Sequence, residues 1–413
     1  MTERQNSTSL DGRTVCVVTP VPLTSDSRTL KQVCTLRRLA AHVVTIAAGK
    51  RTLEDFAALR AASAGPRAAS IDSPLFRLWL WARSTRQPAI VVAPFFAVWL
   101  CLFLMRTIHL SWKLPHAELF VLHGVTTYPA YAISGRRAPF VYDIHDFYCG
   151  VEPDNEIGTF EHVFLRPFLR FIEARCIEAA AETVTVSRGL ADLVETSYGR
   201  RPDVFRNVHD IRLDQEPDAD IRMRLRLDED AFLIAVIGNH KPGQRFDSLF
   251  AALSMTAPNI HAALIGRGYE ILAPQIASAG LSERVHIAGA LPPWSIVPSV
   301  RSANLAALPY YGRSENYSFS LPNGFFQSVG AALPLLYPDL PEMRALADRY
   351  DMGLMVDWAS AEDIAAKIGE IHGNPDLAAR LRQNAAAASE ILSWQREEEP
   401  WREILSSILS VES

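Results

Sequence analysis

The 413-residue sequence has few cysteines and no excess of positive charge. Its five cysteines are scattered, with no C-x-x-C pair and no histidine at zinc-binding spacing: Cys16, Cys34, Cys101, Cys149 and Cys176. This excludes a disulfide framework and a local zinc motif, and predicts buried free thiols in a reducing compartment. The net charge of −5 supplies no field that would attract nucleic acid. The length is sufficient for two domains of about 200 residues each.

The polar start, "MTERQNSTSLDGR", lacks the apolar core of a signal peptide, so we expect a cytoplasmic protein. One uncharged segment, Ala89 to Met105 ("AIVVAPFFAVWLCLFLM"), complicates this expectation. A spanning helix needs about 20 residues, with a lower limit of about 17, and Pro94 should interrupt it or mark its first turn.

Three interpretations of this segment remain open: a buried core helix, insertion into one leaflet, and a membrane span. Trp and Arg in Leu75 to Arg83 ("LFRLWLWAR") suit an interface and favour insertion into one leaflet. We therefore treat residues 75–113 as a segment that associates with the membrane surface. A true span would separate strands that must share one sheet.

Continuous apolar runs alternate with helical stretches along the chain, which predicts an α/β fold with parallel sheets covered on both faces. In the first half the expected strands are Thr14–Pro22, "HVVTIAA", Leu119–Gly124, Phe140–Asp146 and Glu182–Ser187. The polar stretch that starts at Arg206 reads as a linker, and the pattern then restarts. The later strands are Phe232–Gly238, His261–Gly266, Val285–Gly289, Asn304–Tyr310 and Leu333–Pro338. We thus expect two doubly wound, Rossmann-like domains, residues 1–210 and 211–392, with a cleft between them, and a last amphipathic helix in 393–413.

Ligands of such sheets bind at the carboxyl ends of the strands, so candidate residues are sought there. In the first half, His145 and Asp146 follow one strand and His123 follows another. A histidine there can accept a proton or hydrogen-bond a hydroxyl near neutral pH. No further ligands stand at local spacing, so no metal site is expected. The D-x-D of residues 218–220 lies in the charged linker and is interpreted as solvated.

In the second half, three turns contain residues suited to phosphate. Glycines allow backbone amides to approach an anion, and a cation neutralises it. The residues concerned are Gly238, Lys241 and Arg245 in "GNHKPGQR", and Gly266 in "IGRG". The loop Ser320, Leu321, Pro322 and Asn323 precedes a helix whose free N–H groups could bind phosphate oxygens, and Gln327 one turn later could hydrogen-bond a ribose hydroxyl.

Taken in order, these stretches resemble the retaining glycosyltransferases of family 4, which have the two-domain GT-B fold. The resemblance covers nearly the whole chain and is carried by "DSRTLKQVCTLRRLAAHVVTI", "VYDIHDFY", "FIEARCIEAAAETVTVSRGLADLVETSYG", "LPNGFFQSVGAALPLLYPDLPE" and the final "SW". It implies that His145 lies in the active site, that Asp26 and Arg28 belong to the acceptor-side domain, and that the last helix crosses back to that domain.

The chain departs from the family at the donor site. Asn239 stands where an arginine is usual, and the lysine position falls on Gln244 or is supplied by Arg245. The two acids of the E-x7-E motif are replaced by Phe319 and Gln327. Gly324 stands where one subfamily has lysine.

The resemblance implies a bacterial-type glycosyltransferase that moves a sugar from a nucleotide-sugar donor to a lipid-linked or polysaccharide acceptor, with retention and without an essential metal or other cofactor. We expect it in the cytoplasm, peripheral or monotopic on the inner face of the plasma membrane. The departures leave two alternatives open: a non-catalytic relative that binds sugar or supports a partner transferase, and a nucleotide-sugar epimerase or phosphorylase on the same fold.

Overall fold

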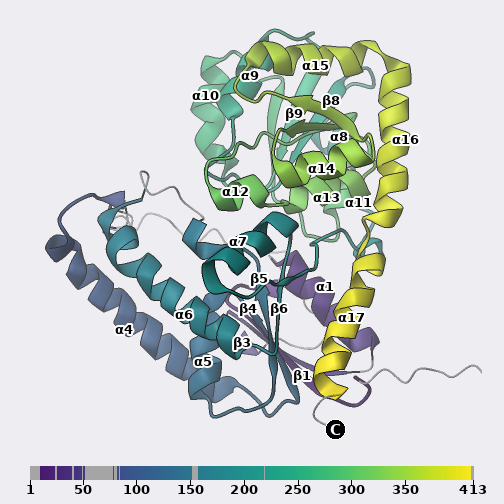
Figure 1. The fold of residues 1–413 in the computed structure, drawn as a ribbon. Helices are drawn as coiled ribbons and strands as arrows, with labels where there is room; N and C mark the ends of the chain where they lie inside the picture. Colours follow the sequence, from purple (N-terminus) through teal and green to yellow (C-terminus); the bar gives the residue numbers. More distant parts are fainter. Residues whose placement is uncertain are drawn as a thin grey trace, which may run out of the picture. The chain divides into compact units, whose positions relative to one another are not determined.

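A computed structural model describes residues 10–23, 26–39, 41–48, 50–51, 78, 81–82, 84–150, 157–217 and 219–410 (Figure 1). The polar start of the chain, most of the stretch 75–83 and Asp218 of the D-x-D lie outside these residues. The chain divides into two compact units. The first comprises Met1–Val186, Leu190–Phe205 and Glu399–Ser413, and the second comprises Ser187–Gly189 and Arg206–Glu398.

The first unit is built on a seven-stranded sheet with the order β3-β2-β1-β4-β5-β6-β7. Its strands are β1 (Thr14–Thr19), β2 (His42–Ala47), β3 (Lys50–Arg51), β4 (Leu119–His123), β5 (Phe140–Ile144), β6 (Glu182–Thr185) and β7 (Asp203–Val204). All neighbours pair in parallel except β2 and β3. Every residue of β4 and β5 is buried, because helices cover both faces of the sheet.

The helices of the first unit connect these strands. They are α1 (Ser27–Arg38), α4 (Ala89–Lys113), η2 (Val125–Thr127), α5 (Tyr128–Ile133), η3 (Tyr148–Gly150), η4 (Phe160–Leu165), α6 (Arg166–Ala179) and α7 (Arg188–Tyr198). Asp26 caps α1, since its side chain accepts a hydrogen bond from the Thr29 amide. Part of α17 (Trp394–Ser410) also belongs to this unit, where Trp401 stacks on Phe205 with ring centroids 5.2 Å apart.

The second unit has a six-stranded parallel sheet with the order β10-β9-β8-β11-β12-β13. Its strands are β8 (Phe232–Ile237), β9 (Ile260–Ile265), β10 (Val285–Gly289), β11 (Leu305–Ala307), β12 (Leu335–Pro338) and β13 (Gly353–Val356). Its helices are η5 (Ile211–Leu213), α8 (Ile221–Leu225), α9 (Phe246–Ser254), η6 (Tyr269–Leu272), α10 (Ala273–Ser278), α11 (Ile296–Val300), α12 (Glu315–Phe319), α13 (Asn323–Gly330), α14 (Pro341–Arg349), α15 (Ala361–Gly373) and α16 (Pro375–Ile391). β8 lies at the centre and all six of its residues are buried. The predicted α/β class with two doubly wound sheets is confirmed.

Among the described residues, α4 alone is long and apolar enough to cross a membrane. Only 6% of its most apolar stretch is buried, so the interpretation as a buried core helix is wrong. The expectation for Pro94 is also wrong, because the helix begins five residues earlier, at Ala89, and continues through the proline to Lys113. A proline this close to the start of a helix removes one backbone hydrogen bond and leaves the following turns intact.

Candidate functional site

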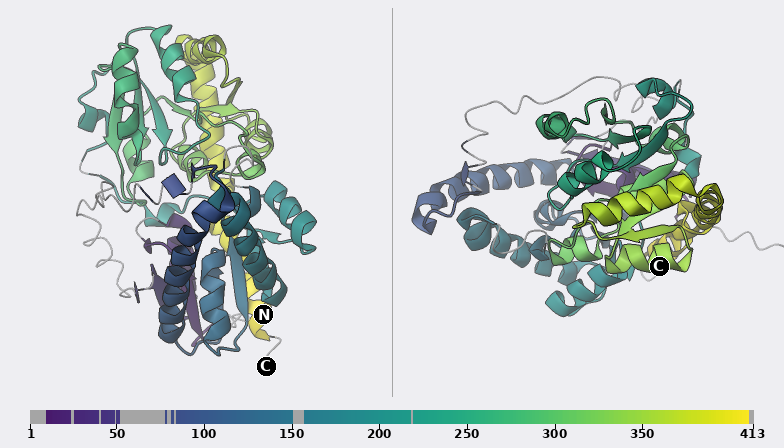
Figure 2. Two further views of the ribbon diagram at one scale, coloured as in Figure 1. Left: turned by 90° about the vertical axis from the view of Figure 1, so that its left-hand side faces the viewer. Right: turned by 90° about the horizontal axis from the view of Figure 1, so that it is seen from above.

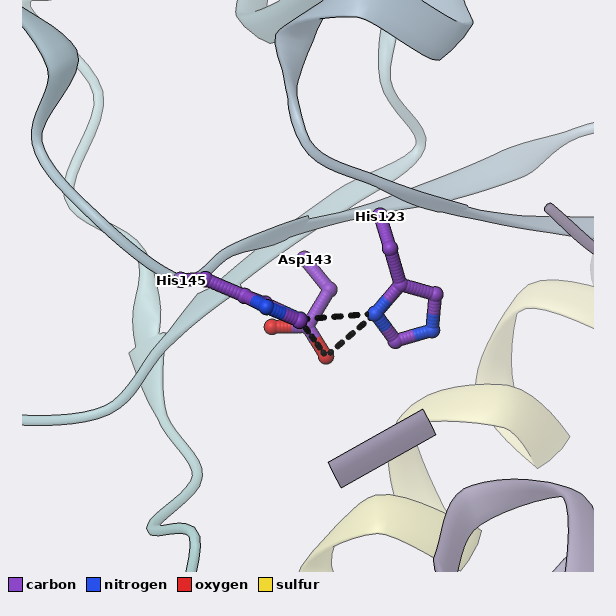
Figure 3. A group of neighbouring side chains, drawn as sticks. All are labelled: His123, Asp143 and His145. Atoms are coloured by element: carbon purple, nitrogen blue, oxygen red, sulfur yellow. Dashed lines mark hydrogen bonds and ion pairs between the residues drawn. The ribbon is translucent and has the colours of Figure 1, made fainter. Parts of the chain in front are cut away.

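In the first unit, the ends of two neighbouring strands bring His123, Asp143 and His145 together (Figure 3). His123 ends β4, Asp143 lies in β5, and β4 and β5 pair so that these two residues are partners in register. His123 Nδ1 lies 2.8 Å from His145 Nε2 and 3.5 Å from Asp143 Oδ2. Both His123 and Asp143 are fully buried, whereas the His145 side chain is 30% exposed. His145 is therefore the member of the cluster that a ligand can reach.

The Asp143 carboxylate is held by two side chains of α1. Arg28 donates from Nε to both carboxylate oxygens, at 2.9 and 2.8 Å, and Gln32 Nε2 donates to Oδ2 at 2.5 Å. Arg28 also donates from a terminal nitrogen to the Phe205 carbonyl at 2.7 Å. Burial alone would raise the pKa of Asp143, but the Arg28 charge and these hydrogen bonds hold it far below its usual value. Asp143 is thus a fixed negative charge beneath the two histidines.

His123 is a neutral imidazole at any pH near neutrality. Burial lowers its pKa to about 4, although the nearby Asp143 opposes that shift. Its Nδ1 faces two acceptors, the Asp143 carboxylate and His145 Nε2, while its Nε2 is buried without a hydrogen-bond partner. We therefore assign the single proton to Nδ1, which leaves His145 Nε2 as an acceptor. A neutral His145 then carries its own proton on Nδ1 and can donate it to a bound hydroxyl or oxyanion.

These three side chains have metal-ligand chemistry, but their geometry favours hydrogen bonding. Two nitrogen ligands of a tetrahedral zinc ion, each about 2.0–2.1 Å from the metal, lie about 3.3 Å apart. The 2.8 Å separation of the two histidine nitrogens is shorter and matches a direct hydrogen bond. Both oxygens of Asp143 already accept from the Arg28 cation, whose charge disfavours a metal ion beside it.

The other candidates of the first unit fall into two groups. Asp26 joins the cluster: it is buried, and it accepts hydrogen bonds from the hydroxyls of Thr19 at 3.0 Å and Thr29 at 2.5 Å. Burial opposes ionisation, but His145 and the hydrogen bonds from Thr29 hold the pKa of Asp26 below its usual value. Asp146 is exposed. Of the predicted residues, Asp26, Arg28, His123 and His145 thus come together.

In the second unit, three turns meet at the carboxyl end of β8, and glycine makes the approach possible. A side chain on Gly266 would place its Cβ 1.9 Å from the Gly238 carbonyl oxygen. A side chain on Gly324 would place its Cβ 2.1 Å from the Ile237 carbonyl oxygen. The turns that follow β8 and β9 therefore touch through their backbones, and the start of α13 rests on the end of β8. Position 324 therefore has no room for a side chain beside β8.

Arg245 presents its guanidinium beside these turns. Its Cζ lies 4.2 Å from the centroid of the Tyr311 ring, and its backbone N–H donates to the Pro309 carbonyl at 2.7 Å. Its Nε is buried without a hydrogen-bond partner. A stacked guanidinium with a buried, unpaired N–H can donate a hydrogen bond to an acceptor atom of a bound ligand. Gln244 does not take over the role of the usual lysine. Its side-chain Oε1 accepts a hydrogen bond from the Lys241 amide at 2.8 Å.

The first turn of α13 is a second group of hydrogen-bond donors in this unit. The helix begins at Asn323 after Pro322 without a side-chain cap, and the Phe325 amide donates to the Pro322 carbonyl at 2.9 Å. Ser320 donates to the Tyr317 carbonyl at 3.3 Å, Leu321 is buried, and Asn323 is exposed with its side-chain oxygen accepting from Asn207. Gln327 is buried one turn in, as expected. Phe319, at the other acid position, is half-buried at the end of α12.

Two predicted donor residues have other roles in the structure. The Asn239 side chain closes the turn, since its Oδ1 accepts from the Arg267 amide at 3.0 Å. Lys241 is exposed on the far side of the same turn, and only its backbone N–H takes part in a described hydrogen bond. The sequence did not identify Asp143, Gln32 or Tyr311, which position His145 and Arg245. The only signal for Asp143 was a carboxylate inside an otherwise apolar strand.

No family model matches the sequence, and no curated protein matches it closely enough to count as a relative. The structure is similar to solved structures over nearly its full length. Sucrose-phosphate synthase from Thermosynechococcus elongatus is 13% identical, with a TM-score of 0.66 over 97% of this chain and 100% of that one. HepE from Anabaena, solved in complex with UDP-glucose, is 17% identical, with a TM-score of 0.64 over 96% of this chain and 100% of that one.

A third similar structure is WaaG, a glycosyltransferase involved in lipopolysaccharide biosynthesis. It is 12% identical, with a TM-score of 0.57 over 95% of this chain and 98% of that one. At these identities the likeness establishes the fold. The chain has the GT-B glycosyltransferase fold, as its sequence resemblance implied.

Proposed function

We propose that this protein is a glycosyltransferase that takes a sugar from a nucleoside-diphosphate donor and passes it, with retention of anomeric configuration and without a metal, to a lipid-linked or polysaccharide acceptor. HepE binds UDP and UDP-glucose on the same fold, which makes a nucleotide sugar the donor class to expect here.

The observation that carries the proposal is Arg245. Its guanidinium is stacked on Tyr311 and its Nε–H is buried and unpaired, at the carboxyl end of β8 where ligands of open α/β sheets bind. An arginine held this way suits a diphosphate, because the planar guanidinium can donate two parallel hydrogen bonds to phosphate oxygens. Nothing in the fold itself requires an unpaired buried donor at this position.

The uncapped start of α13 supplies the remaining positive potential. The amides at the start of this helix and the helix dipole favour a negative charge beside Ser320–Asn323. When the bond between the anomeric carbon and the diphosphate oxygen breaks, that oxygen gains negative charge. Arg245 and these amides would stabilise the departing diphosphate, and no divalent cation is needed for that role.

The first unit would supply the acceptor side. His145, with its proton on Nδ1, would donate a hydrogen bond to a hydroxyl of the reacting sugar, and Asp143 and His123 would hold the ring in that tautomer. The acceptor hydroxyl forms the new bond to the anomeric carbon and passes its proton to an oxygen of the departing diphosphate.

A second candidate, a non-catalytic relative that binds sugar or supports a partner transferase, is favoured by the missing donor-site acids. Gln327 and Phe319 offer no charge to the donor, and Gly324 no cation. Turnover separates the two candidates. The purified protein is incubated with UDP-, GDP-, ADP- and dTDP-sugars and a lipid extract, and release of the nucleoside diphosphate is followed.

Release from one donor that depends on the extract and disappears in Arg245→Ala supports the transferase. Release without the extract, at an undiminished rate, would indicate hydrolysis of the donor. An epimerase would change the donor sugar without releasing the nucleoside diphosphate. No release from any donor, with nucleotide still bound, would favour the non-catalytic relative.

A further inference from the structure

The helix α4 exposes a continuous apolar surface along its length. Eight large apolar side chains of this helix are solvent-exposed: Ile90, Val91, Val98, Leu102, Leu104, Met105, Ile108 and Trp112. At its two ends Ile90 is 83% exposed and Trp112 is 80% exposed. Soluble proteins rarely leave so large an apolar surface uncovered, so something covers it when the protein functions.

The opposite side of α4 is covered by the protein itself. Phe96 stacks on Phe164 of η4 with ring centroids 5.1 Å apart, and Phe103 meets Phe168 of α6 edge to face at 5.5 Å. Both views of Figure 2 show α4 running beside α6 within the first unit. These aromatic contacts thus hold α4 against the outside of its unit.

Both ends of α4 are tied to the same unit, which argues against a membrane span. Before the helix, the Thr85 carbonyl accepts a hydrogen bond from the Thr159 amide at 2.9 Å. Towards its end, Arg106 donates to the Pro20 carbonyl at 3.2 Å, just after β1. A 25-residue helix is about 37 Å long, enough to cross a hydrocarbon core of about 30 Å. A helix held at both ends along one unit can only lie in the plane of the membrane.

The charged residues of α4 and of the segments that flank it in sequence are all basic. No acidic residue occurs from Ser84 to Ala117, whereas Arg86, Arg106 and Lys113 flank the apolar segment. The neighbouring α6 adds exposed Phe171, whose ring lies 5.7 Å from the Arg175 guanidinium. Cations at the edge of an apolar surface complement the phosphates of anionic lipids.

We propose that α4, together with Phe171 of α6, forms an interfacial membrane anchor that lies in the plane of a leaflet containing anionic phospholipids. The inference rests on the first unit alone and does not depend on whether the chain is a transferase.

The first test is co-sedimentation of the full-length protein with vesicles of phosphatidylcholine, with and without phosphatidylglycerol. We expect stronger binding to the anionic vesicles. Leu102→Glu and Met105→Glu should each weaken binding about tenfold or more, because each removes an apolar side chain from the lipid. The matched control is Ile271→Glu, an equally exposed apolar residue of η6 in the second unit, which should bind as the wild type does.

Cys101, halfway along α4, is exposed, so the prediction that the free thiols are buried is wrong for this residue. A label on it reports the depth of the helix. With Cys34 and Cys149 changed to alanine, a spin label on Cys101 should lie about 5–10 Å below the headgroups, as for an in-plane helix. A label at the bilayer centre would contradict the in-plane anchor and indicate a span. Unchanged vesicle binding by Leu102→Glu would overturn the proposal. It would also be overturned by a dimer in solution that Leu102→Glu dissociates, since a second copy would then cover the surface.

Discussion

Arg28 and Asp143 form a fully buried ion pair that links α1 to β5, two residues before His145. The guanidinium Nε donates to both carboxylate oxygens, and the two side chains are 2% and 0% exposed. The Arg28 guanidinium also lies over the Phe205 ring, 4.7 Å from its centroid. Through this pair α1, β5 and the segment after β7 are fixed to one another.

Removing one partner should therefore be costly. Arg28→Ala leaves the Asp143 charge buried without its cation, and we expect a loss of about 3–5 kcal/mol in unfolding free energy. Chemical denaturation of the full chain measures it. The control is Arg201→Ala, which removes an exposed partner of Asp192 and Glu195 and should leave the unfolding midpoint unchanged. Equal effects of the two substitutions would contradict the buried-pair account.

The stability of the first unit should fall as the pH falls below 6.5. The pKa of His123 is about 4 in the folded protein and about 6.5 when unfolded, so between these values the unfolded chain binds more protons. The contribution of neutral His123 to the unfolding free energy is therefore fully present above pH 6.5. It is lost progressively towards pH 4, by up to about 3 kcal/mol. Asp143, whose pKa is also lowered, adds to the loss below pH 4. In His123→Asn the slope between pH 6.5 and 4 should become shallower; an unchanged, wild-type slope in this variant would show that another group titrates.

His123 should also control the tautomer of His145. In the wild type, nitrogen-15 NMR should show His145 with its proton on Nδ1 at pH 8, because its Nε2 accepts from His123. In His123→Ala this preference should weaken towards the mixture of a free imidazole. A His145 ring protonated on Nε2 in the wild type would reverse the proposed direction of the hydrogen bond.

Gly324 should tolerate no side chain. Its missing Cβ would lie 2.1 Å from the Ile237 carbonyl oxygen, so Gly324→Ala must displace α13 from β8, at a cost of about 1–3 kcal/mol. The control is Gly369→Ala on the exposed face of α15, where a Cβ meets nothing within 4 Å; it should stabilise by about 0.5–1 kcal/mol. Thermal unfolding of both variants measures these changes in stability. An unchanged unfolding midpoint for Gly324→Ala would contradict the close approach of α13 to β8.

Much of this fold could be predicted from the sequence, because buried parallel strands are continuous apolar runs. "FLIAVIG" and "LFVLHG" lie on β8 and β4 within one or two residues of the expected bounds. No comparable pattern marks β13, whose residues Gly353–Val356 make a short run with only its last residue buried. The extent of α4 was also missed, since the polar residues after Met105 hide the continuation of the helix to Lys113.

The candidate site was predicted in part. Residues directly after strands, such as His145 and Arg245, could be found because loops at strand ends bind ligands. The residues that position them could not be predicted from the sequence. Asp143 is inside a strand, and Tyr311 lies in a loop far from Arg245 in sequence. Only the folded chain brings each beside its partner. The lack of room for a side chain at position 324 likewise shows only once α13 is seen to rest on β8.

The most direct measurement is a calorimetric titration of the full-length protein with UDP, GDP, ADP, CMP and dTDP. The account predicts saturable binding of one nucleoside diphosphate, accompanied by a higher thermal midpoint, since a ligand of the native state stabilises it. Arg245→Ala should weaken this binding about tenfold to a hundredfold, as expected for one charge-assisted contact. Arg380→Ala, which removes an exposed arginine of α16 in the same unit, should leave it unchanged. Absence of binding by every nucleotide, from a folded sample, would contradict the proposed donor site and with it the transferase.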